Sequence, residues 1–110
     1  MKTEQIDKFK QEIEEEIERR HYNSLVYVLF DELNTTPFAI HIFYRDHLFM
    51  VNSRDDRSYV LGKTFEFTNF LEAKDKFFKV LDFIVREGRR YVAIRGSYMY
   101  SSPLWDDAAE

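Results

Sequence analysis

Residues Asn52–Ala73 read NSRDDRSYVLGKTFEFTNFLEA, in which a charged turn, a Gly-Lys step, an aromatic run and a capped helix follow in close order. Ser58 to Leu61 and Thr64 to Phe67 predict one strand that is interrupted by a bulge near Gly62. Asn69 can cap the helix that follows, with Glu72 three positions later as in a capping box. This region therefore predicts the passage from a sheet into a helix.

Downstream of this region, Phe70, Phe77, Leu81 and Ile84 share one broad apolar face, which is typical of a helix packed on a sheet. Gly88 is expected to end that helix, because glycine tolerates the left-handed conformation found at helix ends. The segment Arg89 to Arg95 then predicts a last strand. Residues 96–110 are expected to form a tail that docks partly through its aromatic side chains, Tyr98, Tyr100 and Trp105, before becoming disordered.

Upstream, the apolar spacing predicts a helix over residues 3–20, with Thr3 as its cap. Leu25 to Phe30 is apolar on both alternating faces, as in a central strand that is covered on two sides. Phe38 to Tyr44 and Leu48 to Val51 predict a hairpin that turns at Arg45-Asp46.

Together these elements predict an α+β fold in the order α-β-β-β-β-α-β. An antiparallel sheet of four to five strands would carry the N-terminal helix and the second helix on it. At 110 residues, the chain is long enough for one core. We expect a single α+β domain over residues 1–97 and a partly docked C-terminal tail over residues 98–110.

The composition limits the classes of function. The formal net charge of -4 disfavours general nucleic-acid binding, which depends on Lys and Arg neutralising phosphates, and suits a basic partner. The absence of cysteine excludes disulfides and thiolate chemistry. Because the sequence shows neither a secretory signal nor an apolar run near the ~20 residues that a membrane helix needs, we expect a cytoplasmic protein with no membrane partner.

Sequence motifs for catalysis or cofactors are weak. Gly62-Lys63-Thr64 resembles the end of a phosphate-binding loop, but Arg57 stands where the full motif requires glycine, so we reject a nucleotide site. With a turn at Arg45-Asp46, His41 and His47 would point to opposite faces and could not share a metal. The pair Asp55-Asp56 lacks further ligands at suitable spacing. We therefore expect no enzyme activity, no metal and no cofactor.

Two charged regions remain open to more than one interpretation. The turn at residues 55–57 could be a solvated turn, with Arg57 paired to Asp55 and Lys63 to Glu66, or a recognition site on a rigid sheet. The second region is a basic second helix and last strand, which hints at a double-stranded RNA-binding domain and gives the competing hypothesis of a nucleic-acid-binding regulator. A solvated helix face explains it better. Its basic residues are Lys74, Lys76, Lys79, Arg86, Arg89, Arg90 and Arg95.

Several motifs, taken together, resemble a known family. They are Tyr22-Asn23-Ser24-Leu25-Val26-Tyr27, Phe30-Asp31-Glu32, Ile42 to Tyr44, Phe49 to Val51, Asp55-Asp56-Arg57, Gly62-Lys63, Glu66-Phe67-Thr68-Asn69 and Glu72-Ala73. On these motifs, residues 5 to about 85 resemble the immunity protein 59 family of bacterial polymorphic toxin systems. The chain departs from the family pattern at the hairpin turn, near Thr64-Phe65 and in the last 25 residues.

The resemblance implies a protein without catalytic activity that binds a cognate toxin domain and occludes it. On this hypothesis the partner-binding residues surround the charged turn and include two acidic residues nearer the N-terminus, namely Asp55, Asp56, Arg57, Tyr59, Asp31 and Glu32. The aromatic chain end could cover an edge of the core or contact a second subunit, so a homodimer is possible. Nucleic acid is the less favoured partner.

Overall fold

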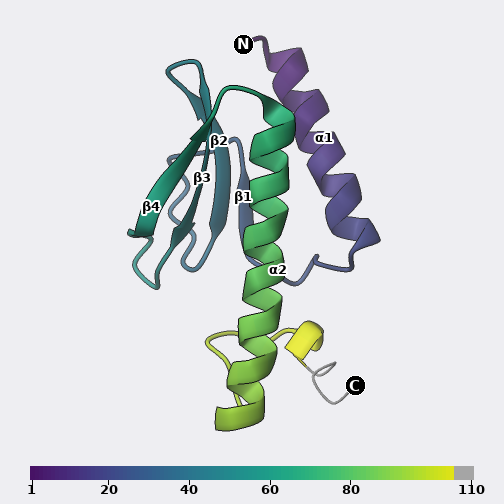
Figure 1. Ribbon diagram of the computed structural model, residues 1–110, viewed down its shortest axis with the longest axis vertical. Coiled ribbons are helices and arrows are strands. Elements are labelled where there is room, and N and C mark those ends of the chain that lie inside the picture. Colours follow the sequence, from purple (N-terminus) through teal and green to yellow (C-terminus); the bar gives the residue numbers. More distant parts are fainter. Residues whose placement is uncertain (106–110) are drawn as a thin grey trace.

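The computed structural model describes residues 1–105 and has the α+β architecture expected from the sequence (Figure 1). Its elements are α1 (Thr3–Arg19), β1 (Tyr27–Leu29), β2 (Ile40–Arg45), β3 (Leu48–Arg54), β4 (Val60–Phe67) and α2 (Phe70–Arg95). Both helices cover the same face of the sheet, with α2 in front of the strands and α1 beside α2. The predicted fold class is confirmed, with four strands in the described residues.

The strands lie in the spatial order β1-β2-β3-β4. β2 and β3 are antiparallel, as are β3 and β4, whereas β1 runs parallel to β2 with Tyr27 opposite Ile40 and Leu29 opposite Ile42. The prediction of a central strand at residues 25–30 is therefore wrong, because β1 is an edge strand. The connection between β1 and β2 carries the chain back, so that both strands start at the same end of the sheet.

The β2–β3 hairpin turns at Asp46-His47, one residue later than predicted, with Arg45 paired to Leu48. Both turn residues have positive φ, 53° at Asp46 and 64° at His47. Two-residue hairpin loops favour such turns because their twist matches that of the strands. Asp and His enter the left-handed region more readily than most residues, which explains a tight turn without glycine.

The connection between β1 and β2, residues 30–39, passes behind the sheet on the face opposite α2 (Figure 1). It is fastened at both ends, since Phe30 N donates to Ile42 O at 2.8 Å and Phe38 N donates to Asp55 O at 3.0 Å. The second face of the sheet is consequently also buried along the middle of β2 and β3. The buried side chains on this face are His41, Phe43, Met50 and Asn52.

His41 is the most unusual of these residues. Its side chain is 0% exposed, and neither ring nitrogen has a hydrogen-bond partner in the described part of the chain. Burial, together with the positive charge of Arg54, lowers the pKa of His41 from its ordinary 6.5 to about 4, although Asp31 opposes the shift. The imidazole is therefore neutral at pH 7.

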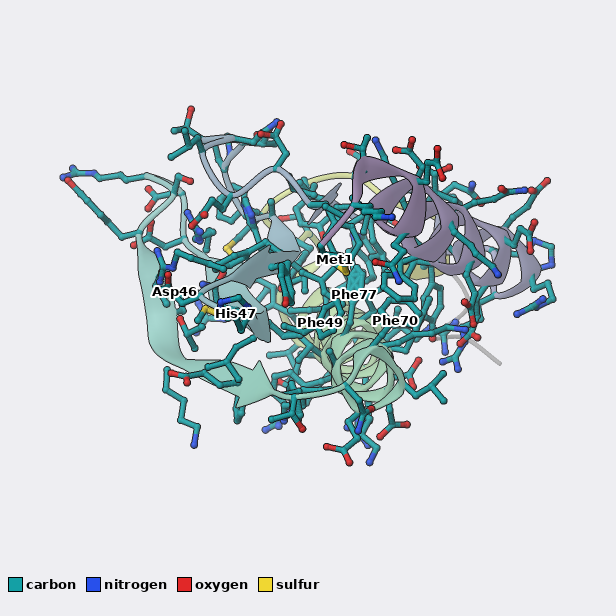
Figure 2. The ribbon with its side chains drawn as sticks, turned by 90° about the horizontal axis from the view of Figure 1, so that it is seen from above. Met1, Asp46, His47, Phe49, Phe70 and Phe77 are labelled. Atoms are coloured by element: carbon teal, nitrogen blue, oxygen red, sulfur yellow. The ribbon has the colours of Figure 1, made fainter. Side chains whose placement is uncertain are left out.

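The main core lies between the helices and the sheet, where Phe49, Phe70 and Phe77 point toward one another (Figure 2). Phe9 of α1 stacks on Phe70 with ring centroids 4.0 Å apart and meets Phe49 edge-on at 5.7 Å. Full burial of a side chain of this size contributes about 1.5–3 kcal/mol. These rings therefore hold both helices to the sheet.

The two helices begin differently. In α2 the predicted cap is confirmed, because Asn69 Oδ1 accepts a hydrogen bond from Glu72 N at 2.9 Å. In α1 the prediction of a Thr3 cap is wrong, since Thr3 is the first helical residue and Lys2 occupies the cap position with no side-chain bond. Only α2 therefore gains side-chain capping at its first turn.

The predicted helix end at Gly88 and the predicted last strand at residues 89–95 are both wrong, because α2 continues to Arg95. Gly88 lies against the indole of Trp105, and a Cβ atom at this position would stand less than 3.0 Å from three ring atoms. The glycine thus permits close packing rather than a left-handed stop. The stop is Gly96, at φ 83°, whose N–H donates to Val92 O at 2.7 Å.

After Gly96 the chain folds back along the end of α2. Trp105 Nε1 donates to Tyr100 O at 2.9 Å, and Arg89 Nε donates to Leu104 O at 2.9 Å. Ser102 Oγ also lies 2.7 Å from Ser24 Oγ, which ties this segment to the residues before β1. The expected disorder falls on residues 106–110, outside the described residues, and the domain boundary at residue 97 stays a prediction.

β4 forms the outer edge of the sheet, opposite β1. Gly62 has φ 69°, and the register of β4 against β3 shifts between Val51 and Ser53, so the predicted bulge is confirmed. Val60 and Leu61, directly before the bulge, are both exposed. The bulge thus interrupts an edge strand whose first half faces solvent.

Candidate functional site

The β3–β4 turn is held by the carboxylate of Asp55. Asp55 Oδ1 accepts hydrogen bonds from Arg57 N at 2.8 Å and from Tyr59 N at 2.9 Å. The Asp55 backbone adds bonds from Ser58 N and to Tyr59 O, at 3.0 and 2.9 Å. Because side chain and backbone of one residue close the turn, its conformation is well defined.

The turn presents three side chains to solvent: Asp56, Arg57 and Tyr59, of which Tyr59 is 67% exposed. Asp56 and Arg57 make no side-chain hydrogen bond or ion pair within residues 1–105. The expected pairing of the Arg57 and Asp55 side chains is not formed, since Asp55 bonds to the backbone. Lys63 does not pair with Glu66 either; its Nζ lies 4.9 Å above the Phe65 ring. The turn therefore carries an acid, a base and a phenol that a partner could reach.

Asp31 and Glu32 lie elsewhere, at the start of the connection behind the sheet. Glu32 Oε2 pairs with Arg45 Nη1 at 3.1 Å, at the C-terminal end of β2. Asp31 Oδ2 accepts a hydrogen bond from Asn34 Nδ2 at 3.4 Å. Both carboxylates thus have partners within the molecule, unlike Asp56.

The six candidate residues consequently form two groups. Asp55, Asp56, Arg57 and Tyr59 lie together at the end of the sheet where β2 begins, because Arg54 N donates to Ala39 O. Glu32 lies beside Arg45, where β2 ends. β2 spans six residues between these two ends, and the five steps along it correspond to roughly 17 Å. The structure brings four of the candidates together and leaves Asp31 and Glu32 apart from them.

Within residues 1–105, no three side chains among His, Asp and Glu gather closely enough to hold a metal ion. His41 is buried on the second face of the sheet, and His47 is exposed in the hairpin turn. In the same part of the chain, neither helix is both long and apolar enough to cross a bilayer.

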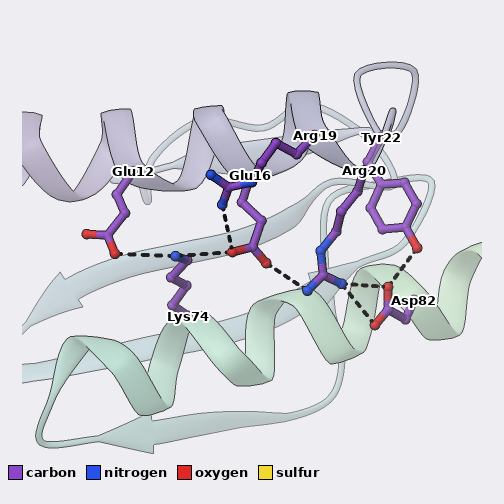
Figure 3. A network of polar contacts seen from close by, with 7 residues as sticks. All are labelled: Glu12, Glu16, Arg19, Arg20, Tyr22, Lys74 and Asp82. Carbon is purple, nitrogen blue, oxygen red and sulfur yellow. Dashed lines mark hydrogen bonds and ion pairs between the residues drawn. The ribbon is translucent and has the colours of Figure 1, made fainter.

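Lys74 and Asp82 of α2 take part in a polar network with α1 and the residues that follow it (Figure 3). Lys74 Nζ lies 3.2 Å from Glu16 Oε1, so it ties α2 to α1. Further along, Asp82 accepts hydrogen bonds from Arg20 Nη1 at 3.1 Å and from Tyr22 Oη at 2.7 Å. Burial, aided by the bond to Asp82, raises the pKa of Tyr22 to about 12. This network fixes the position of α1 on α2 and offers no basic surface.

Lys76 and Lys79 are engaged as well. Lys76 Nζ stands 4.0 Å above the Phe65 ring, and Lys79 pairs with Asp75 at 2.9 Å. The lysines of α2 thus lie in its N-terminal half, and its arginines lie in the C-terminal half.

That half of α2 extends beyond the end of the sheet (Figure 1) and carries arginines interleaved with exposed apolar side chains. Phe83 is 50% exposed, Tyr91 43% and Ile94 69%. Sequence analysis listed these arginines in a basic region but did not place them on one helical face with exposed apolar side chains, because it assigned residues 89–95 to a strand. The spacing of three, four and four from Phe83 through Arg86 and Arg90 to Ile94 would have indicated one helical face.

With this geometry established, comparisons place the chain among known proteins. A family model described as immunity protein 59 matches residues 6–106. Searches of curated proteins and of solved structures found no match. The match runs past residue 85, where the resemblance in the sequence was expected to end, so it takes in the segment that packs on α2. Since it spans most of the 110 residues, the chain belongs to the immunity protein 59 family.

Proposed function

We propose that this protein is an immunity protein that binds the toxin domain of a bacterial toxin and neutralises it by occlusion, without catalysis. Membership of the immunity protein 59 family supports this function. The observation that carries it is the β3–β4 turn, in which Asp55 fixes the backbone while Asp56, Arg57 and Tyr59 remain exposed. A surface that is already ordered loses little conformational entropy on binding.

In this proposal the turn is the primary contact and each of its residues has a distinct role. Tyr59 supplies a large amphipathic ring, and Arg57 a planar donor, both of which are enriched among the residues that dominate interface energies. Asp56 supplies charge complementarity to a basic group on the toxin. Asp55 acts by holding the turn. Asp31 and Glu32 contribute to binding only if the partner also reaches the C-terminal end of β2.

The protein acts in the cytoplasm, where it meets its toxin. A first test is a pull-down from the native host with the tagged protein as bait and mass spectrometry as the readout. Recovery of one large secreted protein through its C-terminal domain is the expected result. Recovery of nucleic acid or ribosomal proteins that added salt removes would point instead to a regulator.

The second test locates the contact. Replacing Asp56, Arg57 and Tyr59 together by Ala should weaken binding of the recovered domain by more than about tenfold. The matched control is Glu14→Ala with Glu15→Ala, two exposed residues of α1. Circular dichroism should show both variants folded. Equal affinity of the turn variant and the control would show that the turn is not the contact.

A further inference from the structure

An exposed face of α2, here called the arginine strip, lies opposite the face that packs on the core. The buried residues Phe77, Leu81, Val85 and Gly88 define the inner side of the helix. The strip extends over the C-terminal half, where α2 has passed the end of the sheet (Figure 1). Phe83, Arg86, Arg90 and Ile94 lie on this face, and the exposed Tyr91 and Arg95, which the helical period places nearer the inner side, border it and are counted with the strip.

The charge of the strip is available to a partner. Arg86 and Arg95 have no carboxylate partner in the described residues; instead their guanidinium groups lie 5.9 Å from the Phe83 ring and 5.8 Å from the Tyr91 ring. Arg90 reaches Glu87 at 3.9 Å with its side chain 73% exposed. Contacts with the rings orient two arginines without using their hydrogen-bond donors.

The apolar residues lie among these charges. Phe83 and Ile94 are at least half exposed, and a shallow depression of about 280 Å³ lies between Arg90, Tyr91, Ile94, Glu87 and Arg95. Large exposed side chains next to arginines are the combination found at the energetic centres of protein interfaces. The series Phe83, Arg86, Arg90 and Ile94, spaced three, four and four residues apart, presents one helical face, as does a helix laid into a groove.

The strip is also mechanically supported. On the inner side of the same half-helix, Trp105 packs on Gly88, and Arg89 Nε donates to Leu104 O at 2.9 Å. Phe38, next to the β3–β4 turn, lies 6.1 Å from Tyr100 in the supporting segment. The free half of α2 is therefore braced, and it lies at the same end of the molecule as the β3–β4 turn (Figure 1).

From these observations we infer that the arginine strip inserts into an acidic groove with an apolar floor on the protein that this chain binds. The inference rests on the proposed function and specifies the chemistry of the toxin surface. Three arginines and one glutamate give this face a positive charge on a chain whose net charge is -4, so an acidic surface is the complement. A phosphate-binding cleft, which is basic, would be repelled.

A protein fits the strip better than a nucleic acid does. Bases could stack on Phe83, Tyr91 and the guanidinium groups, but the aliphatic Ile94, 69% exposed, offers no such surface. An apolar floor between carboxylates would accommodate both Ile94 and the arginines beside it.

The test uses the full chain and the C-terminal domain of the secreted protein recovered by the wild-type bait. Arg86→Glu combined with Arg90→Glu should weaken its affinity by more than about a hundredfold, and Phe83→Ala by about tenfold or more. The matched control is Lys8→Glu with Lys10→Glu, which changes the net charge equally on the exposed face of α1. Unchanged circular dichroism and Trp105 emission would show that each variant is folded.

The outcomes separate the two proposals. Recovery of no protein by the wild-type bait would overturn both. Recovery of a domain that binds the Arg86/Arg90 variant as tightly as the Lys8/Lys10 control would overturn the strip and leave the proposed function standing. A third outcome is that wild type and the Lys8/Lys10 control shift a short single-stranded RNA on a gel, whereas the Arg86/Arg90 variant does not but still binds the domain. This result would overturn the acidic groove and make the strip a nucleic-acid surface.

Discussion

Replacing Gly88 by Ala should detach the C-terminal segment from α2. The added Cβ would stand 2.5 Å from Cε3 and 2.7 Å from Cη2 of Trp105, whereas carbon atoms in favourable contact are about 3.5–4.0 Å apart. Neither the helix backbone nor the ring can yield this much locally. We therefore expect Trp105 to leave its site and its hydrogen bond to Tyr100 O to break.

The magnitude follows from the burial of the indole, which is 4% exposed. A Trp side chain buries roughly 150–250 Å², and at about 25 cal/mol per Å² its release costs at most about 4–6 kcal/mol. The freed segment regains conformational entropy, so we expect a net loss of about 2–4 kcal/mol in the free energy of unfolding. In a chain lacking the indole, by contrast, Gly88→Ala should stabilise the helix by about 0.5–1 kcal/mol.

This change of sign makes the experiment decisive. Urea unfolding would be measured for wild type, Gly88→Ala, Trp105→Ala and the double variant, with tryptophan emission recorded for the first two. Trp105 is the only tryptophan in the chain, so its emission should move to longer wavelength when the segment detaches. A Gly88→Ala protein with higher stability and unchanged emission would refute the packing of Trp105 on α2.

Other predictions follow from single side chains. Because the pKa of His41 is lowered to about 4, the unfolded chain binds more protons than the folded chain between pH 6.5 and 4. The free energy of unfolding in urea should therefore fall by about 2 kcal/mol from pH 7.5 to pH 5, and His41→Leu should abolish this fall. An equal fall in wild type and in His41→Leu would contradict the prediction. Asp55→Ala, which removes two bonds to backbone N–H groups, should cost about 1–3 kcal/mol in the same assay at pH 7.5, while Asp56→Ala should cost almost nothing. Asn69→Ala should lower the free energy of unfolding by about 1 kcal/mol through the lost cap, whereas Thr3→Ala should have no such effect; equal values would argue against the cap.

Local sequence signals predicted much of the fold, because they act between neighbouring residues. The cap at Asn69 and the bulge at Gly62 depend on side chains and backbone within a few positions, and both are present. The apolar faces of the two helices were likewise readable from their spacing. Pairing between distant segments has no such local signature, so the parallel association of β1 with β2 was not foreseen.

Gly88 shows how one residue type can mislead. A glycine near the end of an apolar helical pattern can mark a left-handed stop or a close approach by another group, and the local sequence is the same in both cases. Here the approaching group is Trp105, 17 positions later in the numbering. The β-branched and aromatic residues after Gly88 then suggested a strand, and tertiary packing overrode that preference.

In the candidate site, too, local features could be predicted from the sequence and pairing between side chains could not. The exposed turn at residues 55–59 could be located from its charges, and its binding role stays a prediction. Asp55 bonds to the backbone rather than to the Arg57 side chain. The sequence could not predict this choice, because several hydrogen-bond donors compete for the carboxylate within a few residues. The arginine strip was hidden by the mistaken strand, since Phe83, Arg86, Arg90 and Ile94 share a face only if the helix continues past Gly88.

The bulge in β4 has a consequence for behaviour at high concentration. An open edge of eight residues presents unpaired backbone groups to which a strand of another molecule could add, the first step of aggregation. Gly62 breaks the regular spacing of those groups, and Lys63 places a charge at the same point. Both features oppose edge-to-edge association in a chain that is 45% hydrophobic.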